Sequence, residues 1–444
     1  MRFAPHTDAD VRTMLDVIGK PSLAALFDHL PPGVLAGDDW DLAAGLSEDE
    51  VTTRLAGFAA ANNTRAVCFA GGGAYDHFVP AVVGALVSRG ELLTAYTPYQ
   101  PEVSQGLLQA LFEYQTVVTE ITGLPVSNAS LYDGGSAVAE AVAMACASTR
   151  RNRVVLSMGV DRPSRDIVRT YGHPVDRQVE ELAYDSHGRT PVVDVPADAA
   201  AVVIAQPNAL GVVEDVAAWA DRAHAVGAQL VVKLEPTAVG LLQTPGSQGA
   251  DLVIGEGQPL GQGLVYGGPT FGFLACREDQ VRRLPGRLVG ETVDAHGTRG
   301  YVMTLRPREQ DIRREKATSN ICTNQTLTAV AALIYLTWLG PQGLRELAIT
   351  CLARAHHAAE RLTAVDGVTL AVDGPYLKEF ALRLAVPDPH DAVRRLHDAG
   401  YLVGPVVADG PAAGAVLVAT TERRSRDEVE GLADALARVL KEVG

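Results

Sequence analysis

A short loop in the first quarter of the chain carries side chains that could bind a small molecule. Its polar members are Tyr96, Thr97, Tyr99 and Gln100. Two prolines in the same loop restrict its backbone, so the hydrogen-bonding groups are held in fixed directions, as in the lining of a small-molecule pocket. A turn that serves only the fold is the alternative interpretation, and the loop alone does not decide between them.

A second group of residues could hold an anion. Asp133, Gly134, Gly135 and Ser136 come directly before an alanine-rich stretch with helical character. Free backbone amides and the helix dipole attract phosphate to a helix N-terminus, so Gly134, Gly135 and Ser136 are candidate anion ligands. Close helix packing through small residues explains the same glycines about as well.

Lysine chemistry has few candidates in this chain. Of the 38 basic residues, the lysines are Lys20, Lys233, Lys316, Lys378 and Lys441. The glycine-rich segment 255–261 matches neither a dinucleotide-binding pattern nor a Walker loop, and no lysine follows it. It therefore predicts a turn after a strand rather than a nucleotide site.

A metal site is not expected from the sequence. No CxxC or HExxH pattern occurs, and the adjacent His356 and His357 would point about 100° apart on a helix, so they cannot chelate one ion together. The five cysteines are odd in number and mostly embedded in apolar stretches. We interpret them as reduced core residues.

Composition narrows the class of partner. The 444 residues carry 53 acidic and 38 basic side chains, a formal net charge of −15, which argues against nucleic acid or an anionic membrane as partner. The chain has no run of 18 apolar residues, and its first residues lack the layout of a signal peptide. We expect a cytoplasmic protein that binds a small molecule or another protein.

The middle of the chain predicts an α/β fold. Apolar residues at helical spacing, with Ser104 before them and Gly123 after them, predict a helix over 105–122. Continuous apolar runs typical of strands buried on both faces follow at 154–156, 201–205, 230–232 and 252–254. Since helical patterns separate most of these runs, we predict a doubly wound, mainly parallel sheet.

The two ends of the chain predict different structures. Helical patterns at 8–15 and 23–30 indicate an N-terminal helical arm over residues 1–65, ahead of a large α/β domain over 66–325. A long helical region, broken at Gly340 and Pro341, opens a small α+β domain over 326–444. The final helix has Ser425 and Glu428 in the positions of a capping box.

Several segments in one order resemble a known family. The most specific are Gly73–His77, Thr94–Gly106, Asn128–Gly134, Gly255–Gly261, Gly286–Thr292 and Arg313–Gln325. They resemble the glycine decarboxylase (P-protein) of the glycine cleavage system, and in particular subunit 1 of its two-subunit form. The resemblance covers essentially the whole chain and implies a fold type I transferase of the class that uses pyridoxal phosphate (PLP).

The resemblance also implies a reaction and its requirements. In this family, PLP forms a Schiff base with glycine, CO2 leaves, and the aminomethyl group passes to the lipoyl arm of the H-protein. The catalytic sister subunit carries its anchoring lysine eleven residues before the proline of a Gly-Gly-Pro turn. Counting back from Pro269 gives Gln258, which cannot form a Schiff base. Lys233 comes too early to be the anchor and Lys316 too late.

The family's division of labour then assigns PLP to a lysine-bearing subunit 2, with no cofactor held covalently on this chain. An α2β2 assembly, a lipoylated H-protein and glycine are the implied partners and substrate. Tyr96, Thr97, Tyr99 and Gln100 are the residues expected to complete the sister's pocket, by orienting and enclosing the substrate.

Several residues differ from those usual in the family, and they leave alternative functions open. Lys233, Glu235 and Arg162 stand where other residue types are usual, and Ala209-Leu210 replaces two phenylalanines. Relaxed constraint in an unused cleft and a pocket put to a new use both explain them. A repurposed paralogue in a specialised pathway, an inactive scaffold or regulatory protein, and an independent PLP enzyme using Lys233 or Lys316 are the competing functions.

Overall fold

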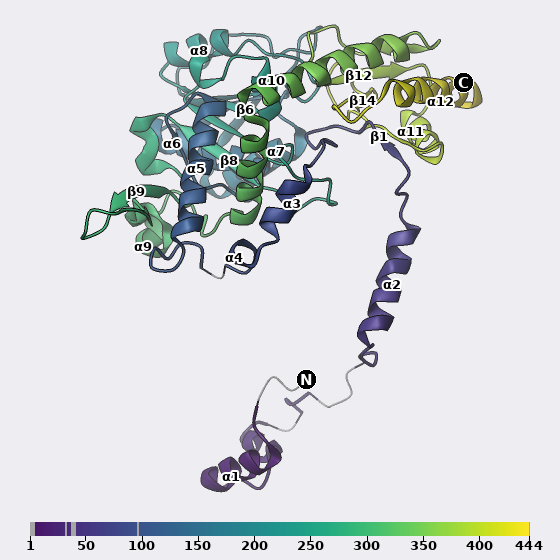
Figure 1. The fold of residues 1–444 in the computed structure, drawn as a ribbon. Coiled ribbons are helices and arrows are strands. Elements are labelled where there is room, and N and C mark those ends of the chain that lie inside the picture. The colour runs from purple at the N-terminus through teal and green to yellow at the C-terminus, as the bar shows by residue number, and fades with distance from the viewer. Residues whose placement is uncertain (1–4, 32, 37–40, 96, 444) are drawn as a thin grey trace. The chain divides into compact units, whose positions relative to one another are not determined.

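The computed structural model describes all residues except 1–4, 32, 37–40, 96 and 444. The chain forms two compact units, residues 1–64 and residues 65–444, which we describe separately (Figure 1). The expected boundary between a large and a small domain near residue 325 lies within the second unit and stays a prediction.

The first unit consists of short helices. Helix α1 (Asp8–Ile18) begins at Thr7 and α2 (Glu48–Ala61) begins at Ser47, each with a complete capping box. The pattern at 23–30 forms only a 3-10 turn, η1 (Ala24–Phe27), because prolines follow it at once. Leu15 and Ala25 are the buried apolar residues among those described in this unit.

A seven-stranded sheet organises the second unit. Its order is β2-β8-β7-β6-β5-β3-β4. The strands are β2 (Val126–Ser127), β3 (Arg153–Ser157), β4 (Gln178–Leu182), β5 (Ala199–Gln206), β6 (Gln229–Leu234), β7 (Leu252–Glu256) and β8 (Gly272–Cys276). Strands β7, β6, β5, β3 and β4 run parallel, while β8 is antiparallel to both of its neighbours. The predicted doubly wound, mainly parallel sheet is confirmed.

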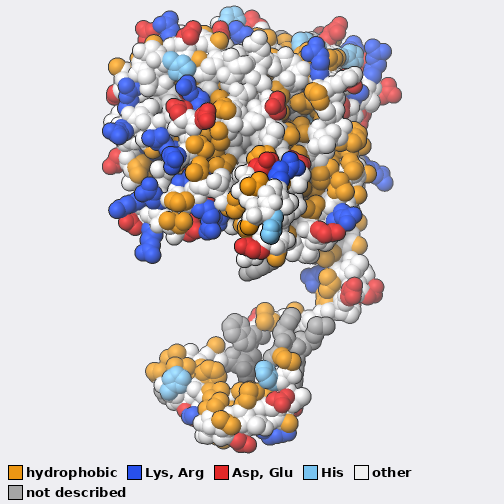
Figure 2. Space-filling view, turned by 60° about the vertical axis from the view of Figure 1, so that its left-hand side comes forward, with side chains coloured by type: hydrophobic (Ala, Val, Ile, Leu, Met, Phe, Trp, Pro, Cys, Tyr) orange, Lys and Arg blue, Asp and Glu red, His pale blue; other side chains and the backbone are white. Residues whose placement is uncertain are grey.

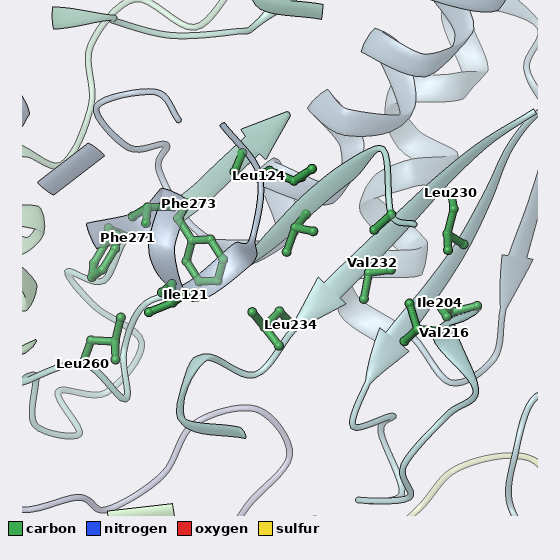
Figure 3. Close-up of a cluster of buried hydrophobic side chains, with 14 of the residues drawn as sticks. Ile121, Leu124, Ile204, Val216, Leu230, Val232, Leu234, Leu260, Phe271 and Phe273 are labelled. Atoms are coloured by element: carbon green, nitrogen blue, oxygen red, sulfur yellow. The ribbon is translucent and has the colours of Figure 1, made fainter. Parts of the chain in front are cut away.

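Helices cover both faces of this sheet because its strands carry apolar side chains on both sides. On β5, Val202 and Ile204 enter one core, and Ala201 and Val203 enter the other. The first core, shown in Figure 3, receives side chains from α5 (Gln105–Thr122), α8 (Val216–Ala225) and α10 (Thr326–Thr363). The second receives them from α6 (Gly134–Thr149) and α7 (Arg162–Gly172).

Helix α10 links the sheet to the C-terminal part. Gly340 leaves the helical conformation at φ 63° and ψ 176°, directly before Pro341, so the predicted break is confirmed. Among the described residues, α10 is the one helix long and apolar enough to cross a membrane. Its buried side chains include Ala332 and Tyr335 of the sheet core, and Ala355 of the C-terminal core, as expected of a core helix in a folded domain.

The C-terminal part is a small α+β structure. Strands β11 (Val368–Leu370), β12 (Glu379–Leu384) and β14 (Val416–Ala419) form an antiparallel sheet with β12 in the centre. Helices α11 (Pro389–Asp398) and α12 (Arg426–Val443) complete it, and the capping box of Ser425 and Glu428 is present. Strand β1 (Val67–Cys68) pairs in parallel with β13 (Tyr401–Leu402), which ties residues near 67 to the C-terminal part.

One detail differs from the prediction and another goes beyond it. Ser104 stands at the N-cap of α5, yet its hydroxyl donates to the Thr97 carbonyl instead of capping the helix. Gly123 ends α5 in the left-handed conformation, as expected. The antiparallel hairpin of β9 (Val289–Val293) and β10 (Arg299–Met303) was not predicted, since its exposed middle lacks an apolar pattern. The remaining short helices are α3 (Ala81–Val87), α4 (Gly90–Leu93) and α9 (Gln310–Arg313).

Truncating one core side chain tests this packing. Leu111 of α5 is fully buried, so Leu111→Ala should lower the free energy of unfolding by about 2–5 kcal/mol, from lost apolar contact and the cavity left behind. Leu93→Ala, at a side chain 57% exposed, is the matched control and should change it by less than about 1 kcal/mol. Urea denaturation measures both values, and equal losses would contradict the assigned core.

Candidate functional site

A cavity of about 270 Å³ lies at the carboxyl ends of the parallel strands. Its walls come from the ends of β5, β6 and β7 on one side and from the C-terminal part, including Glu379, Pro405 and Leu417, on the other. Open parallel sheets usually bind ligands beyond the carboxyl ends of their strands. The charged residues of the wall therefore decide what this cavity can bind.

Gln258 is buried just after β7 and is fully hydrogen-bonded. Its Oε1 accepts from the Tyr75 backbone N–H at 2.9 Å, and its Nε2 donates to the carbonyls of Tyr75 at 3.0 Å and Gln262 at 2.9 Å. The amide thus holds the segment around Tyr75 against the sheet. An amide nitrogen whose lone pair is delocalised is no nucleophile, so this position cannot form a covalent link to an aldehyde.

The N-terminus of α6 holds protein carboxylates. The Gly134 N–H donates to Glu256 Oε2 at 2.9 Å, and the Ser136 N–H donates to Asp133 Oδ1 at 2.7 Å. A side chain at Gly134 would place its Cβ 2.8 Å from the Cβ of Glu256, so glycine is needed for this approach. Burial raises the pKa of Glu256, although the amide bonds it accepts oppose the shift. A phosphate here would have to displace Glu256 and lie beside Asp133.

The end of β6 carries a buried ion pair. Lys378 Nζ donates to Glu235 Oε1 at 2.9 Å, to Thr237 Oγ1 at 3.1 Å and to His77 Nε2 at 2.9 Å. Burial acts to raise the pKa of Glu235, but the Lys378 ammonium outweighs it, and the pKa is lowered. The Glu235 carboxylate is therefore ionised and already paired with a cation.

His77 is held neutral by its surroundings. Burial and the adjacent Lys378 ammonium lower its pKa. Because Nε2 accepts from Lys378, the ring proton must be on Nδ1, which donates to Glu422 Oε2 at 2.7 Å. This histidine orients groups within the fold and has no free nitrogen for a substrate.

Tyr75 and Glu379 close the cavity from the side of β12. The Tyr75 hydroxyl donates to Glu379 Oε2 at 2.9 Å, and the Gly72 N–H donates to Glu379 Oε1 at 2.6 Å. Burial raises the pKa of Glu379. The Lys378 ammonium lies 3.9 Å from the centre of the Tyr75 ring, a cation–π contact that adds to the same cluster.

Lys233 and Asp161 form a second ion pair at the cavity wall, and Asp161 also accepts from the Ser164 N–H at 3.0 Å as the cap of α7. Lys233 Nζ further donates to Ser164 Oγ at 2.9 Å. Despite burial, this pairing lowers the pKa of Asp161. Arg162 lies beside it, largely exposed. The sequence singled out Lys233 and Arg162 but gave no sign that Asp161, 72 residues before Lys233, is its partner.

The loop residues picked out in the sequence lie elsewhere. Thr97, Tyr99 and Gln100 do not line the cavity, and Tyr96 falls outside the described residues. Thr97 Oγ1 donates to Gln100 Oε1 at 3.0 Å, and the Tyr99 hydroxyl donates to Asn324. Asn324 in turn donates to the Ala129 carbonyl at 2.7 Å.

Arg287 completes this second group. Its guanidinium lies 5.1 Å from the centre of the Tyr99 ring and forms an ion pair with Glu309. Burial raises the pKa of Tyr99, so its hydroxyl stays protonated at neutral pH. The sequence pointed to Tyr99 but not to Arg287 or Asn324 as its neighbours, although both fall in the segments that carry the family resemblance.

One group of described residues has ligand types suited to a metal. Atoms of His77, Cys351 and Glu422 lie within 4.8 Å of one another. His77 and Glu422 already bond each other, and the Lys378 ammonium lies against the ring. Burial raises the pKa of the Cys351 thiol to about 12, so it is not a thiolate at neutral pH. This arrangement does not suit a cation.

The fold and the position of the cavity define a class of protein. A seven-stranded sheet with antiparallel β8, helices on both faces and a small C-terminal α+β part make this a fold type I structure of the PLP-dependent class. A sphingosine-1-phosphate lyase from Burkholderia pseudomallei has the same fold at a TM-score of 0.67 and 14% identity. At that identity the likeness shows the fold alone.

Proteins of higher sequence identity show to which family the chain belongs. Residues 1–436 match the model of the glycine cleavage system P-protein. A crystal structure of glycine decarboxylase (P-protein) of the glycine cleavage system, in inhibitor-bound form, superposes with a TM-score of 0.93 at 44% identity, covering 99% of this chain and 100% of that one. A probable glycine dehydrogenase (decarboxylating) subunit 1 from Geotalea daltonii is 46% identical over 98% of this chain and 99% of its own.

The equivalent protein of Methylococcus capsulatus is also 46% identical, over 99% of this chain and 100% of its own. The chain therefore belongs to the glycine cleavage system P-protein family and is a subunit of a glycine-decarboxylating enzyme complex. The comparisons do not favour a repurposed paralogue or an inactive scaffold.

The Lys378–Glu235 pair can be tested by removing its cation. Lys378→Met leaves Glu235 buried without a counter-ion and should lower the free energy of unfolding by about 3–5 kcal/mol at pH 8. In the native protein, the lowered pKa of Glu235 gives stability above about pH 4.5 that is lost as the pH falls through the folded-state pKa. In the variant, Glu235 would instead take up a proton on folding.

The loss caused by Lys378→Met should therefore be smaller at pH 5 than at pH 8. Urea denaturation at the two pH values measures it, with Lys441→Met on the exposed face of α12 as control. A loss that does not depend on pH would contradict an ionised Glu235 in the native protein.

Proposed function

We propose that this chain is the subunit of glycine decarboxylase that does not anchor PLP. It works with a lysine-bearing sister subunit, which holds the cofactor. This chain completes the sister's pocket. The reaction removes CO2 from glycine and transfers the aminomethyl group to the lipoyl arm of an H-protein. We propose a cytoplasmic α2β2 assembly as its working form.

The observation that carries this proposal is that each group suited to PLP is already engaged within the chain. Gln258 replaces an anchoring lysine and is fully hydrogen-bonded. Glu256 takes up the Gly134 amide where a phosphate would bind, and Lys378 neutralises Glu235 where a pyridine nitrogen would need a free carboxylate. PLP therefore does not fit this cavity, and no step of the reaction is assigned to it.

Exposed apolar side chains support a lasting partner. Val82 and Leu86 of α3 are each 38% exposed, and Trp338 of α10 is 54% exposed, although α3 and α10 pack together. Apolar side chains left exposed on helices that pack together are a feature of surfaces that another protein covers. The sister subunit is the partner that the family supplies.

Tyr99, with Thr97 and Gln100, is the part of this chain that we propose to act at the sister's pocket, and Tyr96 belongs to the same loop. Tyr99 is fixed through Asn324 and Arg287, so its position is set before substrate binds. Its raised pKa keeps the hydroxyl a donor. The role that suits it is orientation and closure of the pocket rather than proton transfer.

Cofactor binding can be measured on the single chain. With added PLP, the purified chain should show no absorbance band between 300 and 500 nm that survives gel filtration or that borohydride fixes to the protein. The co-purified pair of subunits should show one, fixed to the sister. A borohydride-fixed adduct on Lys233 or Lys316 would overturn the proposal.

The loop can be tested in the assembled enzyme. Tyr99→Phe should lower kcat/KM for glycine–bicarbonate exchange by about 10–100-fold, because a displaced pocket wall costs orientation. Assembly, followed by gel filtration, should be unchanged. Tyr171→Phe, at a partly exposed tyrosine of α7, is the matched control. An unchanged rate in Tyr99→Phe would remove this residue from the shared pocket.

A further inference from the structure

A basic surface stands out on this acidic chain. Residues 282–316 carry nine basic and five acidic side chains, whereas the whole chain carries 38 and 53. Figure 2 turns the side of the unit that bears β9 and α9 toward the viewer, and Lys and Arg side chains gather on it. The excess is thus local in sequence and gathered on one side of the unit.

We define the basic surface as the basic members of this segment whose side chains have no hydrogen-bond or ion-pair partner among the residues described. They are Arg282, Arg283, Arg313, Arg314 and Lys316. Arg313, Arg314 and Lys316 are exposed. In contrast, Arg287, Arg299 and Arg306 of the same segment each have an acidic partner. Unpaired exposed guanidinium groups remain free to bind a carboxylate of another molecule.

Contacts join the two parts of this surface. Arg308 donates to the Leu284 carbonyl, which ties the end of the 278–283 turn to the residues before α9. Arg287 pairs with Glu309, the residue at the start of α9. Arg308 and Arg287 therefore hold residues 282–284 and 306–316 together, so that they form one surface.

The same contacts place the basic surface next to Tyr99. Arg287 pairs with Glu309 on one side and lies over the Tyr99 ring on the other. A depression of about 300 Å³ runs along this contact, lined by Arg287, Gln310, Asp311 and Cys322 among others. The free cations thus border the loop that we propose to reach the sister's pocket.

We propose that the basic surface docks an acidic face of the lipoyl-carrying protein that accepts the aminomethyl group. The inference rests on the proposed function, which requires that carrier to approach the shared pocket. A net charge of −15 repels an acidic protein from most of this chain. Unpaired cations beside Tyr99 attract it to the one region where its arm is useful, and such steering raises association rates by about 10–1,000-fold.

Charge reversal tests the docking. Arg313→Glu, Arg314→Glu and Lys316→Glu, combined in the assembled enzyme, should raise KM for the recombinant lipoylated H-protein by about tenfold or more at low salt, with little change in kcat. The KM of the native enzyme should rise with added NaCl, and that of the variant should depend on it less. Arg345→Glu with Arg438→Glu, two exposed arginines on α10 and α12, is the control and reverses as many charges as the Arg282 and Arg283 variant described below.

Free lipoate separates docking from chemistry. Free lipoate needs no docking surface, so the rate of aminomethyl transfer to it should be the same in the native and the variant enzyme. A second variant, Arg282→Glu with Arg283→Glu, should also raise KM for the carrier, which guards against a local folding defect in the first.

An unchanged KM for the carrier would overturn the docking proposal. Loss of the sister subunit on gel filtration would also overturn it, because the surface would then belong to the subunit interface. A variant that also slows with free lipoate would place these residues in the pocket instead. Absence of activity in the native assembly with either acceptor would refute the proposed function itself, and the docking with it.

Discussion

The rest of the site depends on the hydrogen bonds that the buried ammonium group of Lys378 donates. A buried charge is tolerated only when its hydrogen bonds are complete, and Lys378 has three acceptors, Glu235, His77 and Thr237. These acceptors come from the end of β6, the turn after it and the segment near residue 77, while Lys378 itself precedes β12. This one charge therefore links the sheet, the segment around His77 and the C-terminal part around the cavity.

Around this centre, other polar groups of the cavity wall are also paired within the protein. Glu235 is neutralised by Lys378, the segment of Tyr75 is held by Gln258, and Glu256 takes the amide of Gly134. Each of these contacts satisfies a buried polar group without a ligand. Because these charges are paired within the protein, their burial does not depend on a bound ligand.

A second group of residues lies outside the wall of the cavity. Tyr99, Arg287 and Glu309 form a row in which a ring, a guanidinium and a carboxylate each hold the next. The row connects the loop of Tyr99 to the basic surface. Because neighbouring charges in this row are compensated, the uncompensated cations beyond it are left to act on molecules outside the chain.

The class of fold, the break at Gly340 and the glutamine at position 258 could all be read from the sequence, because they depend on local spacing, backbone preference and residue identity. The sequence also pointed to Tyr99, Lys233 and Gly134 as residues of interest. The residues that they contact follow from the three-dimensional fold. Glu256 lies 122 residues from Gly134, and Lys378 lies 143 residues from Glu235. Pairings at such separation are set by the order of strands in the sheet and the docking of the C-terminal part, which no local pattern records.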